Sequence, residues 1–154
     1  MSPSDKRNAL ASGLPDKLLN RLFFQARNLA IEAMLLRLDN LLLRKGFNAR
    51  CEWHESSFGG PVLLLKMFNP KPGQWEYGSC RAFLKREHIN APDEMSPSFY
   101  SVASVKTAEY WPRKQPQQLL DFRSAVAALA ETGELAREVE KVNFPFDYQR
   151  LSVF

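Results

Sequence analysis

Cysteine, histidine and glycine are scarce in this chain of 154 residues, which contains two, two and seven of them respectively. Two cysteines, Cys51 and Cys80, are too few for a disulfide framework. A domain of this length buries about 70% of its unfolded surface and needs no covalent cross-links. We therefore expect both cysteines to be buried free thiols.

Long apolar runs are also missing. No run approaches the 18 or so residues that indicate a transmembrane helix. The first residues, Met1 to Arg7, are polar and charged and lack the apolar stretch of a secretory signal. These absences predict a cytoplasmic protein without a membrane partner.

Catalytic and metal-binding motifs are absent in the same way. No G-x-S-x-G elbow occurs, and Gly59-Gly60 is not followed by the Lys-Ser/Thr pair of a phosphate-binding loop. The sequence therefore predicts a protein that is not an enzyme, with no metal and no cofactor. The possible zinc ligands also lack the C-x₂₋₄-C or H-x₃₋₅-H spacing of structural zinc sites: Cys51, His54, Cys80 and His88.

The charge of the chain is positive and unevenly distributed. The net charge is +4, and fourteen basic and eight acidic residues fall within 1–90, against seven and nine within 91–154. Such an excess favours an anionic partner, either nucleic acid or an acidic protein. A basic domain that binds no nucleic acid is the alternative, because charge alone does not specify a partner.

A long helix is expected from Leu14 to Lys45. Pro15 suits the first turn, where its missing N–H would have no partner, and Gly46 suits the left-handed position that ends a helix. Leucine recurs at every seventh residue of this helix, and apolar residues occupy most of its perimeter. The pattern fits either a helix–helix seam in a homodimer or a central core helix in a monomer. The repeat consists of Leu22, Leu29, Leu36 and Leu43.

After this helix the hydrophobic period changes to two, which is typical of strands. Short polar turns separate the strands, so they are expected to form a four-stranded antiparallel meander. A C-terminal helix that begins at Pro116 and ends at Gly133, or two short helices, would pack on one face of the sheet. This α+β domain comprises residues 14–154, and residues 1–13 are expected to be flexible. The predicted strands are 49–54, 61–68, 75–85 and 99–106.

The third strand carries the best candidate site, because aromatic and basic residues alternate with small ones along it. Rings that stack on bases and cations that hold phosphates are suited to single-stranded nucleic acid. The opposite interpretation is that the large aromatics face the long helix and are buried. The proposed site consists of Trp75, Tyr77, Arg81, Phe83 and Lys85, extended by Lys66, Lys71, Arg113 and Lys114.

The sequence therefore favours a homodimeric, non-enzymatic accessory or regulatory protein that binds single-stranded DNA or RNA. The alternative is a protein-binding module such as an inhibitor, an immunity-type protein or a secretion chaperone. That alternative is based on the aromatic tail at 143–154, on Tyr110 and Trp111 in a loop, and on the apolar surplus of the long helix.

Overall fold

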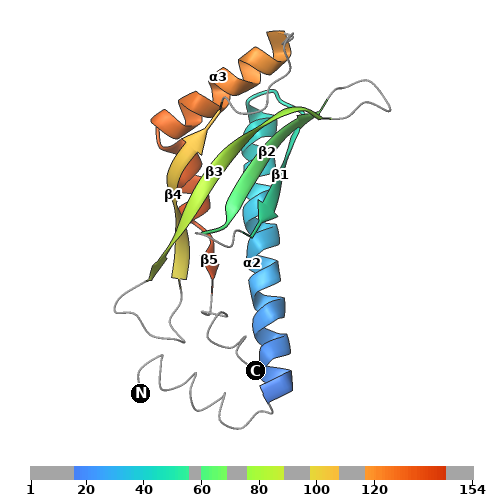
Figure 1. Ribbon diagram of the computed structural model, residues 1–154, viewed down its shortest axis with the longest axis vertical. Coiled ribbons are helices and arrows are strands. Elements are labelled where there is room, and N and C mark those ends of the chain that lie inside the picture. The colour runs from blue at the N-terminus through green and yellow to red at the C-terminus, as the bar shows by residue number, and fades with distance from the viewer. Residues whose placement is uncertain (1–15, 56–59, 69–75, 89–97, 108–116, 145–154) are drawn as a thin grey trace.

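The computed structural model describes residues 16–55, 60–68, 76–88, 98–107 and 117–144. These ranges hold a long helix, an antiparallel sheet and two shorter helices (Figure 1), so the chain has the α+β fold that the sequence predicts. None of these helices combines the length and apolar character needed to cross a membrane. In chain order the elements are α2 (Asp16–Arg44), β1 (Ala49–His54), β2 (Val62–Phe68), β3 (Glu76–His88), β4 (Ser98–Lys106), α3 (Gln117–Glu131), α4 (Glu134–Glu140) and β5 (Asn143–Phe144).

The sheet has five antiparallel strands in the order β1-β2-β3-β4-β5. The prediction of four strands was wrong by one, because β5 lies at the start of the segment expected to be a tail. This strand has only two residues, which pair Asn143 with Phe99 and Phe144 with Ser98. Two residues are too few to produce a recognisable period of two, so no sequence pattern marks β5.

The third strand is longer than expected. It runs to His88, three residues beyond the predicted end at Lys85, and its last residues pair with the beginning of β4. The segment Arg86-Glu87-His88 is polar throughout, which is why it resembled a loop. Its strand conformation is stabilised by pairing with Ser98, Phe99 and Tyr100 rather than by burial of its own side chains.

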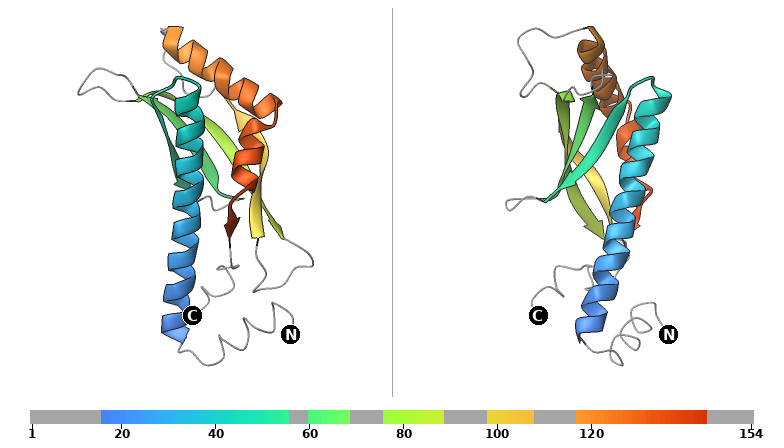
Figure 2. Two further views of the ribbon diagram at one scale, coloured as in Figure 1. Left: turned by 180° about the vertical axis from the view of Figure 1, so that it is seen from behind. Right: turned by 90° about the vertical axis from the view of Figure 1, so that its right-hand side faces the viewer.

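The helices α2, α3 and α4 all lie on one face of the sheet (Figures 1 and 2), as the sequence predicts. Alternate strand residues point to this inner face and are buried: Cys51, Leu63, Leu65, Met67, Cys80, Ala82, Leu84 and Tyr100. We call the opposite side the outer face. Its described residues are exposed or half-buried and comprise Arg50, Glu52, His54, Val62, Leu64, Lys66, Ser79, Arg81, Phe83, Lys85, Glu87, Phe99, Ser101, Ser104 and Lys106.

The core between sheet and helices contains aliphatic and aromatic side chains from every layer. Phe122 of α3 is fully buried, and its ring meets that of Phe47 edge-on with centroids 5.5 Å apart. At the other end of the sheet the rings of Trp53, Tyr100 and Phe144 form a second cluster, with centroids 4.8–5.8 Å apart. Phe144 thus packs back on the domain, and the rest of the predicted tail lies outside the described residues.

Both cysteines are buried free thiols, as predicted. Helix α2 ends at Arg44, and Gly46 follows with φ of 94°, a left-handed conformation that favours glycine. Gly133 has φ of 80° and separates α3 from α4. The glycine signals for helix ends were therefore correct in both places.

The leucine repeat of α2 does not lie in the core. The residues that face the sheet are Phe23, Ala30, Met34, Leu38, Leu41 and Leu42. The residues of the repeat are exposed instead: Leu22 by 45%, Leu29 by 67%, Leu36 by 61% and Leu43 by 66%. The interpretation of these leucines as part of a central core helix was wrong, although the other apolar face of the same helix is buried.

Polar contacts hold α2 against its neighbours. Glu138 of α4 accepts a hydrogen bond from Arg37 Nε at 3.0 Å and lies 3.9 Å from Arg44 Nη2. Asp39 accepts a hydrogen bond of 2.7 Å from the backbone N–H of Cys51, which joins α2 to β1. Arg27 forms an ion pair with Glu55. These polar contacts fix the direction of α2 relative to the sheet.

Candidate nucleic-acid interface

Four of the predicted site residues lie together on the outer face: Lys66, Arg81, Phe83 and Lys85. Strand pairing explains their proximity, because β2 and β3 are adjacent and Arg81 lies opposite Leu64, two residues before Lys66. The inner face of β3 carries Cys80, Ala82 and Leu84, which are small or aliphatic and pack under the helices. The alternative in which the aromatics of this strand face the long helix is therefore wrong for Phe83.

Other predicted site residues cannot be assigned to this surface. Trp75, Lys71, Arg113 and Lys114 lie outside the described residues. Tyr77 belongs to β3 by its backbone, and its side chain is outside the described part. The interface is therefore built below from the described residues, and the contributions of these five residues remain predictions.

Two cations that the sequence analysis left out of the site complete it. Arg50 of β1 lies opposite Lys66, and Lys106 of β4 lies opposite Arg81. Arg50 occupies a polar position of an alternating strand, so the period of two was the signal that could have identified it. Lys106 lies on the outer face because of the register shift between β3 and β4. Together with Lys66, Arg81 and Lys85 they place basic residues on four adjacent strands.

One aromatic ring lies among these cations. Phe83 is half-buried on the outer face, and Lys106 Nζ lies 5.6 Å from the centre of its ring. A cation at this distance from the ring face is attracted by the ring quadrupole. The same ring and cation could hold a stacked base and its phosphate, because bases stack on aromatic side chains while cations hold the backbone.

Carboxylates balance only part of the positive charge. Glu52 lies 3.0 Å from Lys66 Nζ and 2.9 Å from His54 Nε2, and the hydrogen bond to His54, followed by that to Lys66, lowers the pKa of Glu52. Glu87 accepts a hydrogen bond of 3.2 Å from Ser101 Oγ. The described outer face thus has five Lys or Arg residues against these two carboxylates. Glu52 partly neutralises the β1 side, and β3 and β4 carry Arg81, Lys85 and Lys106 beside Glu87 on the described outer face.

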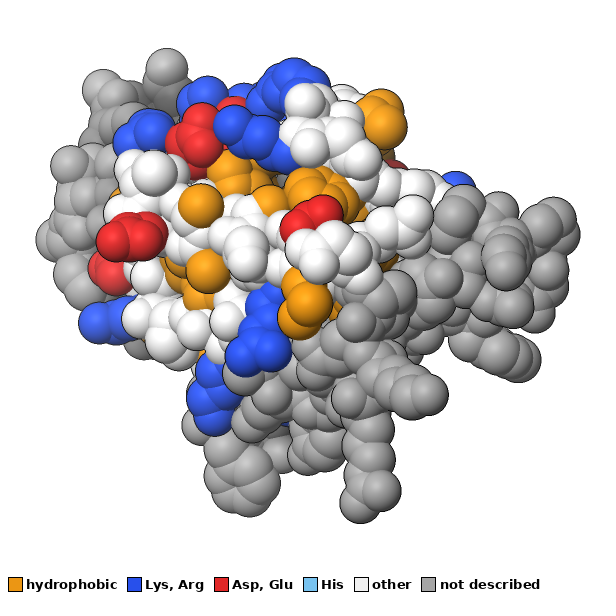
Figure 3. Space-filling model, turned by 90° about the horizontal axis from the view of Figure 1, so that it is seen from above, with side chains coloured by type: hydrophobic (Ala, Val, Ile, Leu, Met, Phe, Trp, Pro, Cys, Tyr) orange, Lys and Arg blue, Asp and Glu red, His pale blue; other side chains and the backbone are white. Residues whose placement is uncertain are grey.

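Figure 3 shows the distribution of charged side chains on the molecule, seen from the end at which α3 lies. Lys and Arg side chains gather along two opposite edges of the described surface, and hydrophobic side chains lie exposed between them. On the side of the helices, Arg37 and Arg44 lie near Glu138, and Lys45 lies near Glu134. These three cations of the helical side are therefore matched by acids of α4.

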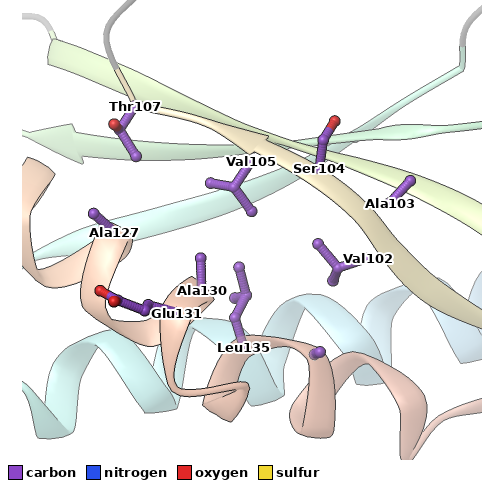
Figure 4. Close-up of a pocket in the computed structure, with 10 residues that line it drawn as sticks. Val102, Ala103, Ser104, Val105, Thr107, Ala127, Ala130, Glu131 and Leu135 are labelled. Carbon is purple, nitrogen blue, oxygen red and sulfur yellow. The ribbon is translucent and has the colours of Figure 1, made fainter.

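A separate hollow of about 430 Å³ lies between β4 and the helices α3 and α4 (Figure 4). Val105, Ala130 and Leu135 point toward one another across it. Glu131 is the one titratable side chain in its lining. Ser104, Thr107 and Glu131 add polar groups to the lining, and a single carboxylate offers no acid–base pair.

The two thiols do not supply a nucleophile. Burial raises the pKa of Cys80 to about 12. Burial, together with the negative charge of Asp39 and a hydrogen bond to it, also raises the pKa of Cys51 well above its usual value. Since the thiolate is the reactive form, both cysteines are inert at neutral pH. Within the described ranges no three His, Cys, Asp or Glu residues are grouped closely enough to hold a metal ion.

Comparisons of the chain with protein-family models, with curated proteins and with solved structures find no match.

Proposed function

We propose that this protein binds single-stranded DNA or RNA through the outer face of its sheet and acts as a non-enzymatic accessory or regulatory protein in the cytoplasm. The observation that carries the proposal is the group of Arg81, Phe83, Lys85 and Lys106 on adjacent strands, on the face that none of the described helices covers. An aromatic ring among cations on a sheet face is the arrangement that sheet-based single-strand binders use.

In this proposal the nucleic-acid strand crosses β3 and β4, and its phosphate backbone faces the cations. Lys85 and Lys106 are exposed, and Arg81 lies opposite Lys106 on β3. Lysine holds a phosphate as a point charge, whereas arginine offers several donors in a plane. A base stacks on Phe83 in a sequence-tolerant way, because every base has an aromatic face. Binding is thus expected to depend on salt more than on sequence.

The test is a fluorescence-anisotropy titration of the full-length protein with a labelled oligothymidylate of about 15 nucleotides, near the site size of single-strand-binding domains. Saturable binding is expected at about 50 mM salt, and four phosphate contacts would weaken it about fifty-fold at about 200 mM. A flat titration at the lower salt concentration would reject the proposal. Affinity that did not depend on salt would reject the role of the cations.

A protein-binding module remains the second candidate, and the hollow beside β4 favours it because apolar side chains are accessible there. Its lining includes the apolar residues Val102, Val105, Ala127, Ala130 and Leu135 beside the polar residues Ser104, Thr107 and Glu131. A specific protein captured by the wild-type chain, but not by an Ala130→Arg variant that fills the hollow, would support this candidate. The two candidates are separated because Ala130→Arg is expected to leave oligonucleotide affinity unchanged.

A further inference from the structure

We propose that a second copy of this chain covers the exposed leucines of α2, and that the two helices run parallel and in register. The stripe that would form the seam consists of Leu22, Leu29, Leu36 and Leu43, with 45–67% of each residue exposed. This inference goes beyond the proposed function and does not depend on it, because it concerns the helix face opposite the sheet.

The stripe has the geometry of a helix–helix seam. At 100° per residue the four leucines lie within a narrow sector, directly opposite Met34, Leu38 and Leu41, which pack on the sheet. Successive leucines of a seven-residue repeat drift by about 20° around a straight helix, and a left-handed supercoil of two helices removes this drift. The stripe spans three heptads, enough to define a seam.

The residues beside the leucines favour a close two-helix contact. If the leucines occupy position d of the heptad, then position a holds Ala26, Ala33 and Asn40. Alanine at position a allows the two helix axes to approach closely, because the distance between the axes depends on the side chains at the contact. In parallel two-stranded coiled coils, a single asparagine at position a specifies the register, because the asparagines of the two helices meet each other. Asn40 is exposed and available for this role.

Charge decides the direction of the second helix. Glu32 and Asp39 occupy position g on one side of the stripe, and Arg37 and Arg44 occupy position e on the other. In a parallel pair, g of one helix meets e of the next heptad on its partner, so Glu32 meets Arg37 and Asp39 meets Arg44. An antiparallel pair would instead set the two acidic edges side by side. The internal contact of Arg37 with Glu138 uses Nε, which leaves its terminal nitrogens for Glu32.

The dimer would be a four-layer assembly of sheet, helix, helix and sheet. Because the leucines point away from the inner face, the two outer faces would lie on opposite sides of the dimer, each carrying its own Arg81, Phe83 and Lys106. The dimer would then present two separate basic surfaces.

The first experiment measures the mass of the full-length protein by sedimentation equilibrium. We expect twice the chain mass of 17.7 kDa for the wild type. The double variant Leu29→Glu/Leu36→Glu should sediment as a monomer with an unchanged circular dichroism spectrum, because both side chains are exposed in the single chain. Leu120→Glu, an exposed leucine on α3, is the matched control and should stay dimeric. A monomeric wild type, or a dimer that survives the double substitution, would overturn the proposal.

The second experiment tests the direction of the helices with the variant Asn40→Cys. In a parallel pair the two new thiols face each other, and mild oxidation should give a disulfide-linked dimer on a non-reducing gel. In an antiparallel pair centred on the stripe they would lie about 22 Å apart along the axis and could not react. The wild type is the control, since both of its own cysteines are buried. A dimer without this cross-link would contradict the parallel arrangement.

Discussion

Reversing the charge of Arg81 and Lys85 together is expected to lower the affinity for oligothymidylate about 100-fold at about 50 mM salt. Each cation that holds a phosphate on a single strand contributes about 0.7 to the slope of log affinity against log salt. The double variant Arg81→Glu/Lys85→Glu should therefore reduce this slope by about 1.4, and repulsion from the new carboxylates adds to the loss. Anisotropy titrations at several salt concentrations give both quantities.

The control variant must change the net charge of the protein by the same amount, on a surface that is not part of the proposed interface. Arg137→Glu/Lys141→Glu does so on α4 and at the residue directly after it, and both residues are exposed on the helical side. Its affinity should fall by much less than that of the sheet variant, since only the overall charge differs. Equal losses in the two variants would mean that net charge, and not the outer face, attracts the nucleic acid.

Truncating Phe122 should cost about 3–5 kcal/mol of the free energy of unfolding. Phe122 is fully buried between α3 and the sheet, and its ring meets the edge of Phe47. The variant Phe122→Ala loses the transfer energy of the ring and leaves a cavity that the surrounding core only partly refills. Because small domains are stable by only about 5–15 kcal/mol, this single change is a large fraction of the total. Urea denaturation followed by circular dichroism measures it.

Leu120 provides the comparison on the same helix. It is 38% exposed, so Leu120→Ala removes fewer contacts and should cost about 1 kcal/mol or less. If both substitutions had similar small effects, α3 would not pack on the sheet through the face that holds Phe122. The pair of variants therefore tests the placement of the C-terminal helix layer independently of any ligand.

Local signals were enough to predict most of the fold. Gly46 and Gly133 mark helix ends by their need for positive φ, and the alternation of Ala49, Cys51 and Trp53 with polar residues marks β1. β5 could not be predicted, because its two residues form a strand only through their pairing with Ser98 and Phe99. The charged end of β3 is a similar case, in which a neighbouring strand decides the conformation.

The candidate site was only partly predictable, since it depends on strand register. The period of two placed Arg81, Phe83 and Lys85 on one face of β3, and the structure confirms this. Lys106 joins them because a register shift between Phe83 and Leu84 brings it opposite Arg81, which no local pattern reveals. The leucine repeat of α2 was recognised, but a sequence alone does not distinguish a face covered by the same chain from one left exposed.

The outer face and the leucine stripe are separate surfaces on opposite sides of one layer structure. The core residues of α2, such as Met34 and Leu38, hold the helix on the inner face of the sheet. The outer face is therefore not covered by α2, and its polar and basic side chains are accessible. The same placement turns Leu29 and Leu36 outward. A single arrangement of helix and sheet thus produces both surfaces, and each has its own test.

The central claim is that nucleic acid contacts the outer face of the sheet, and the most direct measurement maps that contact. Ultraviolet cross-linking to an oligothymidylate, followed by mass spectrometry of the peptides, locates the protein residues that touch the bases. The account predicts cross-links in β3 and β4, centred on Phe83 and the segment that ends at Lys106. Cross-links confined to α2, α3 or α4 would contradict it.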